Sequence, residues 1–135
     1  VDLSPAMLER AGQRGAYDRL VAADLMTFLG GPAETEAYDL MFASDVLPHI
    51  GDFTALLTAA AARLRPGGAF LFSTEHSEAE DLVPLPEFRF RHSLAHVETA
   101  AAAAGLAVAA HLVRQIRIER GAPVMGGLYL LRRPG

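Results

Sequence analysis

Hydrophobic and polar positions along the chain are grouped in segments that predict both helices and strands. Residues 39–43 and 69–74 are apolar over most of their length, which is typical of strands buried on both faces of a parallel sheet. Apolar side chains in residues 53–64 recur every three or four positions, which predicts an amphipathic helix. Helices are also expected to begin at Ser4 and Ser93, because serine caps helix amino ends.

Glycine and proline clusters divide these elements. The clusters at 30–32 and 66–68 are expected to break the chain, and residues 76–92 are predicted to form a long polar connection. An acidic helical or looped stretch around Glu34 and Glu36 is expected after the first break.

Three further strands are predicted. Residues 20–23 are short and apolar and end at Asp24. Residues 106–119 and 127–132 are expected to be strands joined through 121–123, and so short a connection implies an antiparallel pair. The alternation of helices and strands predicts a three-layer α/β sandwich with a mainly parallel sheet and a C-terminal antiparallel β-hairpin.

Composition narrows the functional classes. The 135 residues are 51% hydrophobic and 21% charged, which fits one globular domain. The net charge is -4 and no block of arginines is visible, so no nucleic-acid partner is expected. The chain has no cysteine, which excludes disulfides and fits a cytoplasmic location. No membrane span is expected, and the five histidines are too scattered to predict a metal site.

Four segments, in this order, resemble class I S-adenosylmethionine-dependent methyltransferases. They correspond to the segment after the family's second strand (1–8), the end of its third strand (23–25), its fourth strand and exit (38–47), and the turn into its fifth strand (64–68). The resemblance covers nearly the whole chain. It implies a Rossmann-like fold, S-adenosylmethionine as cofactor, and methyl transfer to a small-molecule acceptor.

Two details refine this resemblance. Residues 14–18 and 92–93 are similar to bacterial small methyltransferases associated with TPR repeats. The family's glycine-rich loop is not found in the sequence. The resemblance therefore implies that residues 1–135 are the C-terminal portion of a methyltransferase domain, without its first strand, glycine-rich loop and first helix. Such a chain is expected to be inactive alone, and homodimerisation through exposed sheet edges is a further expectation.

Candidate cofactor residues lie where strands of an α/β sheet end, the usual place for ligands. The resemblance implies that Asp2 binds the ribose hydroxyls, that Asp24 contacts the adenine amino group, and that the Leu25 amide contacts the ring. Met7 could pack on the adenine, or belong to the core. The two aspartates could instead be ordinary helix-start or turn residues. The exit of the strand at 39–43 adds Ala43, Ser44 and Asp45, and Asp45 has the alternative role of capping a turn.

Methyl transfer from a sulfonium depends mainly on alignment, and it needs a base only when the acceptor loses a proton. His49 is the candidate base, with a solvent-exposed loop histidine as the alternative. Arginines on the long connection suit a carboxylate or phosphate acceptor, although they could simply form a solvated face. The candidate acceptor residues are Glu75, His76, Arg89, Arg91 and His92.

Two other functions fit parts of the pattern. An acid after a second strand also occurs in nicotinamide-dinucleotide-binding domains. A non-catalytic, methyltransferase-like remnant is the other alternative. The C-terminal strand pair and the position of Asp24 and Leu25 favour the methyltransferase.

Overall fold

The computed structural model describes residues 1–32, 35–79 and 82–135, which form two compact units, Val1–Glu36 and Ala37–Gly135. The predicted acidic position Glu34 and residues 80–81 of the predicted connection lie outside the described residues. The longest described helices have ten residues, too few to cross a bilayer.

The first unit holds two helices, each preceded by a capping side chain. Helix α1 (Pro5–Arg14) follows Ser4, as predicted, and the Ser4 hydroxyl accepts from the Met7 amide. Helix α2 (Leu25–Gly30) follows Asp24 and is absent from the sequence-based prediction.

The strand predicted at residues 20–23 is reduced to a single parallel bridge between Asp2 and Ala22. The Asp2 amide donates to the Val21 carbonyl (3.1 Å), and the Ala23 amide donates to the Asp2 carbonyl (3.2 Å). Two bonds join the two segments without forming a longer ladder, and helix α2 begins directly after them.

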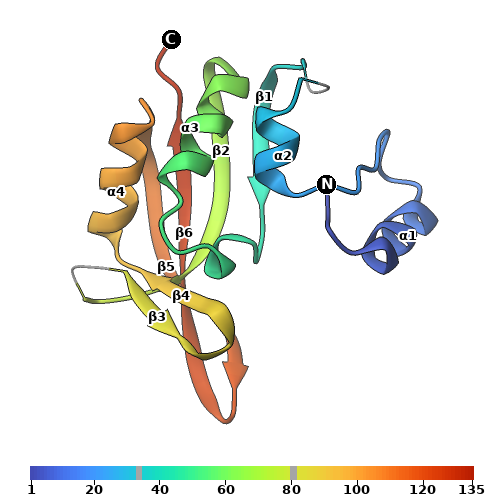
Figure 1. The fold of residues 1–135 in the computed structure, drawn as a ribbon. Helices are drawn as coiled ribbons and strands as arrows, with labels where there is room; N and C mark the ends of the chain where they lie inside the picture. Colours follow the sequence, from blue (N-terminus) through green and yellow to red (C-terminus); the bar gives the residue numbers. More distant parts are fainter. Residues whose placement is uncertain (33–34, 80–81) are drawn as a thin grey trace. The chain divides into compact units, whose positions relative to one another are not determined.

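The second unit is built on β2, whose two edges are both paired (Figure 1). One edge pairs with β6. The other edge pairs first with β1, up to Phe72, and then with β4, from Glu75. β3 pairs with β4, and β5 pairs with β6. The strands are β1 (Tyr38–Ala43), β2 (Leu64–His76), β3 (Val83–Leu85), β4 (Arg89–His92), β5 (Ala107–Glu119) and β6 (Ala122–Arg132).

This sheet is mixed, and the prediction of a mainly parallel sheet is wrong. β1 and β4 run parallel to β2, whereas the β2–β6, β3–β4 and β5–β6 pairs are antiparallel. The predicted polar connection contains β3, the short helix η2 (Pro86–Phe88) and β4. Apolar runs do not reveal these two strands, because β3 has only three residues with a proline at its centre and β4 alternates arginine with other side chains.

The last two strands also differ from their predicted bounds. β6 begins at Ala122 instead of residue 127, directly after a two-residue turn at Arg120 and Gly121. Both turn residues have positive φ angles, 50° and 79°, as a tight turn between antiparallel strands requires. The added strand length carries the turn well beyond the part of β6 that pairs with β2.

Helices α3 (Thr54–Arg63) and α4 (Leu94–Ala103) cover one face of this sheet (Figure 1). Ser93 caps α4, as the sequence predicts, and the Asp52 carboxylate accepts from the Thr54 amide at the start of α3 (2.9 Å). Phe53 lies under the helices and contacts Phe72 edge to face, with ring centroids 6.0 Å apart. The described helices of this unit form one layer, so the unit shows two of the three predicted layers.

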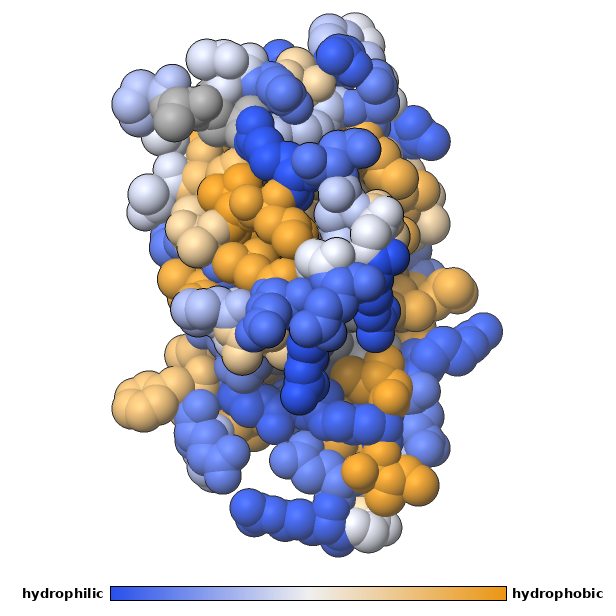
Figure 2. All heavy atoms as spheres, turned by 90° about the vertical axis from the view of Figure 1, so that its right-hand side faces the viewer, coloured by the Kyte–Doolittle hydropathy of each residue, from blue (hydrophilic) through white to orange (hydrophobic). Residues whose placement is uncertain are grey.

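The opposite face of the sheet is apolar and exposed in part. Leu40 and Phe42, on alternate positions of β1, are 61% and 68% exposed, and Leu71 pairs beside Phe42. On the surface drawn in Figure 2, a group of hydrophobic side chains lies below hydrophilic ones, and hydrophilic side chains predominate again at the lower end. The β3–β4 and β5–β6 pairs reach that lower end in Figure 1. Homodimerisation through exposed sheet edges stays a prediction.

Candidate functional site

The first unit places two predicted cofactor residues at the ends of neighbouring segments. The bridge between Asp2 and Ala22 sets Asp24 only two residues beyond the segment paired with Asp2. In each aspartate, one carboxylate oxygen accepts hydrogen bonds from backbone amides two or three residues further along the chain. Oδ1 of Asp2 accepts from the Ser4 amide (2.7 Å), and Oδ1 of Asp24 accepts from the Met26 and Thr27 amides (2.9 and 3.1 Å).

Both aspartates are exposed, so each presents its Oδ2 atom as an acceptor at a helix amino end. Met7 lies in the first turn of α1 and is 52% exposed, which does not fit the core role considered as its alternative. Leu25 is the first residue of α2.

In the second unit, β1 ends at Ala43 and the chain turns sharply through Ser44 and Asp45. Asp45 has a φ angle of 56°, which is uncommon for a residue other than glycine. Its amide donates to the Ser73 hydroxyl of β2 (3.1 Å). This bond holds the exit of β1 against the neighbouring strand, and such strained positions cluster at functional sites.

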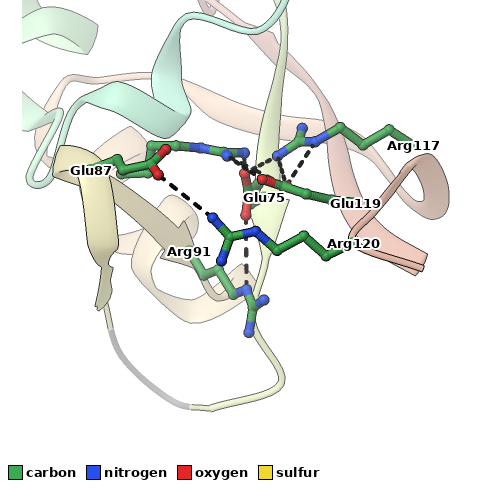
Figure 3. Close-up of polar contacts among 7 residues, drawn as sticks. Glu75, Glu87, Arg91, Arg117, Glu119 and Arg120 are labelled. Atoms are coloured by element: carbon green, nitrogen blue, oxygen red, sulfur yellow. Dashed lines mark hydrogen bonds and ion pairs between the residues drawn. The ribbon is translucent and has the colours of Figure 1, made fainter. Parts of the chain in front are cut away.

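Two residues beyond Ser73, a cluster of charges surrounds Glu75 (Figure 3). Glu75 is 2% exposed, and its carboxylate contacts the guanidinium groups of Arg89 and Arg117. Arg91 approaches the same carboxylate, with its Nε 3.9 Å from Oε2. Buried carboxylates require such partners, because an isolated charge is costly to remove from water.

Glu119 extends the cluster. Its carboxylate lies 3.4 Å from Arg89 Nη1 and 3.2 Å from Arg117 Nη2. Arg120 lies 3.8 Å from Glu87, and both of these side chains are well exposed. The cluster therefore joins the end of β2, the η2–β4 segment and the turn end of the β5–β6 pair.

Four of the seven residues in this cluster, Glu87 among them, were not candidates from the sequence. Arg117, Glu119 and Arg120 come from β5 and its turn, and Arg117 lies 42 positions from Glu75. The alternation of charges at the end of β5 was the only available signal. It indicates exposed positions and does not indicate a partner, because strand register is set by tertiary pairing.

His92 is fully buried, and its ring binds the loop that follows η1 (Leu47–His49). Its Nε2–H donates to the carbonyls of Ile50 (2.9 Å) and Gly51 (3.0 Å), which can only accept. The ring lies 4.7 Å from the Phe53 ring. His92 therefore holds the β1–α3 connection against β4 and exposes no surface to a ligand.

Burial lowers the pKa of His92, and this predicts acid sensitivity. The unfolded chain takes up a proton near the ordinary pKa of about 6.5, whereas the folded chain resists it. The unfolded state then binds more protons, so the free energy of unfolding is expected to fall as the pH drops below about 6.5.

Urea unfolding at about pH 7.5 and about pH 5.5 measures this loss of stability. His92→Gln is the matched variant, because its amide N–H can donate to the same carbonyls without titrating. The variant is expected to lose less stability on acidification than the original chain. Burial also lowers the pKa of His111, so some pH dependence stays in both proteins. Equal losses in both would show that His92 does not cause the effect.

The other two candidate histidines lie apart from the charged cluster. His49 ends η1 and is exposed. His76 follows Glu75 on β2, so its side chain points to the opposite face of the sheet. There its ring lies 6.0 Å from that of His111, and Nε2 lies 3.1 Å from Glu78. Across the described residues, no group of three or more His, Asp or Glu side chains could hold a metal ion.

A family profile described as "Methyltransferase domain" matches residues 1–70. The chain belongs to this methyltransferase family. The resemblance to class I S-adenosylmethionine-dependent methyltransferases is thereby confirmed, whereas the association with TPR repeats stays a prediction. No curated protein sequence matches this methyltransferase chain.

Solved structures share the fold of this methyltransferase chain. One is magnesium protoporphyrin IX methyltransferase from Synechocystis PCC 6803 with bound S-adenosylmethionine (17% identity, TM-score 0.67, covering 97% of this chain and 56% of that one). Another is 1,6-didemethyltoxoflavin-N1-methyltransferase from Burkholderia thailandensis with S-adenosylhomocysteine (19%, 0.74, 98% and 58%). A third is an N-methyltransferase from Bradyrhizobium japonicum in complex with S-adenosylhomocysteine (18%, 0.65, 99% and 65%). The chain thus has a methyltransferase-like α/β fold and spans 56% to 65% of the length of these structures.

Proposed function

We propose that this chain is the C-terminal portion of a domain that binds S-adenosylmethionine and transfers its methyl group to a small-molecule acceptor. The supporting observation is the family match over residues 1–70, which includes every predicted cofactor residue from Asp2 to Asp45. The solved structures with a similar fold include proteins bound to S-adenosylmethionine or S-adenosylhomocysteine. A cytoplasmic location stays a prediction from composition.

The residues present fit the adenosine part of this cofactor. Asp2 and Asp24 offer exposed carboxylate oxygens, which suit hydroxyl and amino donors such as those of ribose and adenine. In the proposal Asp2 binds the ribose and Asp24 the adenine amino group. Leu25 provides its backbone amide, and the exposed Met7 thioether packs on the ring.

The exit of β1 is proposed to lie beside the reacting methyl group. Ala43 and Ser44 are small and allow close approach to the backbone, and the bond from Asp45 to Ser73 holds this turn in place. S-adenosylmethionine supplies an electrophilic methyl group when bound. The protein then needs mainly to align the acceptor, with the exposed His49 as the candidate proton acceptor.

The acceptor is proposed to bind at the Glu75 cluster. Ser73 and Glu75 are alternate residues of β2 and so share one face of the sheet, about 7 Å apart along the strand. The turn held by Ser73 and the charged cluster are therefore neighbours. Of the predicted acceptor residues, Arg89 and Arg91 reach this cluster, whereas His76 faces the other side and His92 supports the fold.

Asp2→Ala is expected to weaken binding of S-adenosylmethionine about tenfold or more, because the ribose would lose a charged hydrogen-bond acceptor. Calorimetric titration of S-adenosylmethionine into this chain, and into the native protein where that is longer, measures the effect. Asp18→Ala is the matched control, since Asp18 is an exposed aspartate of the same unit.

Equal affinity in the Asp2 and Asp18 variants would contradict the ribose role. If no form binds S-adenosylmethionine and a nicotinamide dinucleotide binds instead, the proposed cofactor is wrong. If neither cofactor binds any form, the non-catalytic remnant becomes the better reading.

A further inference from the structure

The charged cluster lines a pocket of about 230 Å³ in the second unit. Residues of the β3–β4 region form one side, and the turn end of the β5–β6 pair forms the other. Glu75, Arg89, Arg91 and Glu119 all line it. Its volume lies below the roughly 300–1,000 Å³ of common ligand pockets, so it suits a small molecule or one chemical group of a larger one.

Two of the arginines in the cluster are already neutralised. Arg89 and Arg117 are each shared between the Glu75 and Glu119 carboxylates. Their side chains are only 17% and 29% exposed. Two cations and two anions thus form a closed, charge-balanced group, which is held together at the centre of Figure 3.

The other three charged residues of the cluster are two arginines and one glutamate, so within the described residues one arginine has no carboxylate of its own. Arg120 also lines the pocket, where it is matched by Glu87, 3.8 Å away. Arg91 has a single ion-pair partner within the described part of the chain, the Glu75 carboxylate that is already in contact with two other guanidinium groups. That distance, 3.9 Å, is longer than a hydrogen bond, and the Arg91 side chain is 47% exposed.

Among the described residues the cluster therefore carries four guanidinium groups and three carboxylates. This local surplus of one positive charge occurs in a chain whose net charge is -4. Arg91 contributes the surplus, and it is one of the residues that line the pocket. A guanidinium presents its N–H donors as a planar fork that matches two carboxylate oxygens.

We propose that this pocket binds a carboxylate group of the methyl acceptor and that Arg91 is the residue that recognises it. The inference rests on the proposed methyl transfer for the identity of the ligand as an acceptor. One carboxylate would balance the surplus charge, whereas a phosphate dianion would exceed it. Glu75 of the pocket lies two residues from Ser73, which binds the turn at Asp45, so the bound carboxylate would orient the acceptor toward the exit of β1.

Titrations of this chain with benzoate and benzamide test the proposal without any cofactor. The two probes have the same size and differ in charge. Benzoate is expected to shift the side-chain Nε–H resonance of Arg91 in nuclear magnetic resonance spectra, and benzamide is not. Arg91→Gln is expected to weaken benzoate binding about tenfold or more, with Arg91→Lys intermediate because it keeps the charge and loses the fork.

Arg10→Gln is the matched control, because it removes the same charge from an exposed position of α1 and is expected to leave benzoate affinity unchanged. The proposal is overturned if benzamide binds as well as benzoate, if inorganic phosphate binds more tightly, or if Arg91→Gln binds benzoate normally. The resonance shift in the unmodified chain gives an answer even if a variant fails to fold.

Failure of the proposed function leaves a different signature. If benzoate binds through Arg91 and S-adenosylmethionine does not bind any form of the protein, the carboxylate pocket stands and the methyl transfer fails. If S-adenosylmethionine binds and the chain methylates only uncharged acceptors, the proposed function stands and the carboxylate pocket is overturned.

Discussion

Replacing Glu75 with glutamine is expected to lower the free energy of unfolding by about 3 kcal/mol, near the lower end of the cost of breaking a buried ion pair. Glutamine keeps the volume of the side chain and removes its charge. The Arg89 and Arg117 guanidinium groups, largely shielded from water, would then share only Glu119. That remaining carboxylate limits the loss. Urea unfolding followed by far-ultraviolet circular dichroism measures it.

Glu119→Gln is the control for this prediction. Glu119 contacts the same two arginines, but its side chain is 41% exposed, so water can replace it. Its substitution is expected to cost less than about 1 kcal/mol. Equal losses in the two variants would mean that burial of Glu75 adds nothing to the strength of the cluster.

Phe53→Ala is expected to lower the free energy of unfolding by about 3–5 kcal/mol, the usual cost of removing a buried aromatic ring. Phe53 is fully buried where α3 begins. Its ring contacts Phe72 on the sheet, His92 at the end of β4 and His96 on α4. The substitution therefore opens a cavity where α3, α4 and the sheet meet.

Phe88→Ala gives the comparison, because Phe88 is 90% exposed and its loss is expected to change stability by no more than about 0.5 kcal/mol. The same urea experiment serves both variants. A loss below about 2 kcal/mol for Phe53→Ala would indicate that the surrounding side chains collapse into the space, or that this core is loosely packed.

Helix starts and buried strands were predictable where a capping residue or an apolar run marks them in the sequence. Ser4 and Ser93 cap helices, as their residue type indicates. The apolar runs at β1 and β2 are strands. In contrast, the short strand expected before Asp24 is only a bridge, and Asp24 caps a helix that was not predicted. A run of four apolar residues fits either context until its pairing partner is known.

The prediction of a mainly parallel sheet failed for a related reason. It was inferred from buried strands and alternating helices, and those features describe β1 and β2 correctly. The direction of β4 and the full length of β6 depend on pairing between segments far apart in the sequence. Hydrophobic periodicity carries little information about such pairing.

The sequence by itself determined the family, the helix caps, the two central strands and the candidate residues Asp2, Asp24 and Asp45. These features depend on residue type and on short sequence spacings, and both can be read from the sequence without knowledge of the fold. Only the tertiary structure decided that Glu75 is buried among arginines from two strand pairs, that His92 supports a loop, and that Arg91 carries the unbalanced charge. The balance of charge at a site depends on strand register and burial, and both arise only when distant segments pack together.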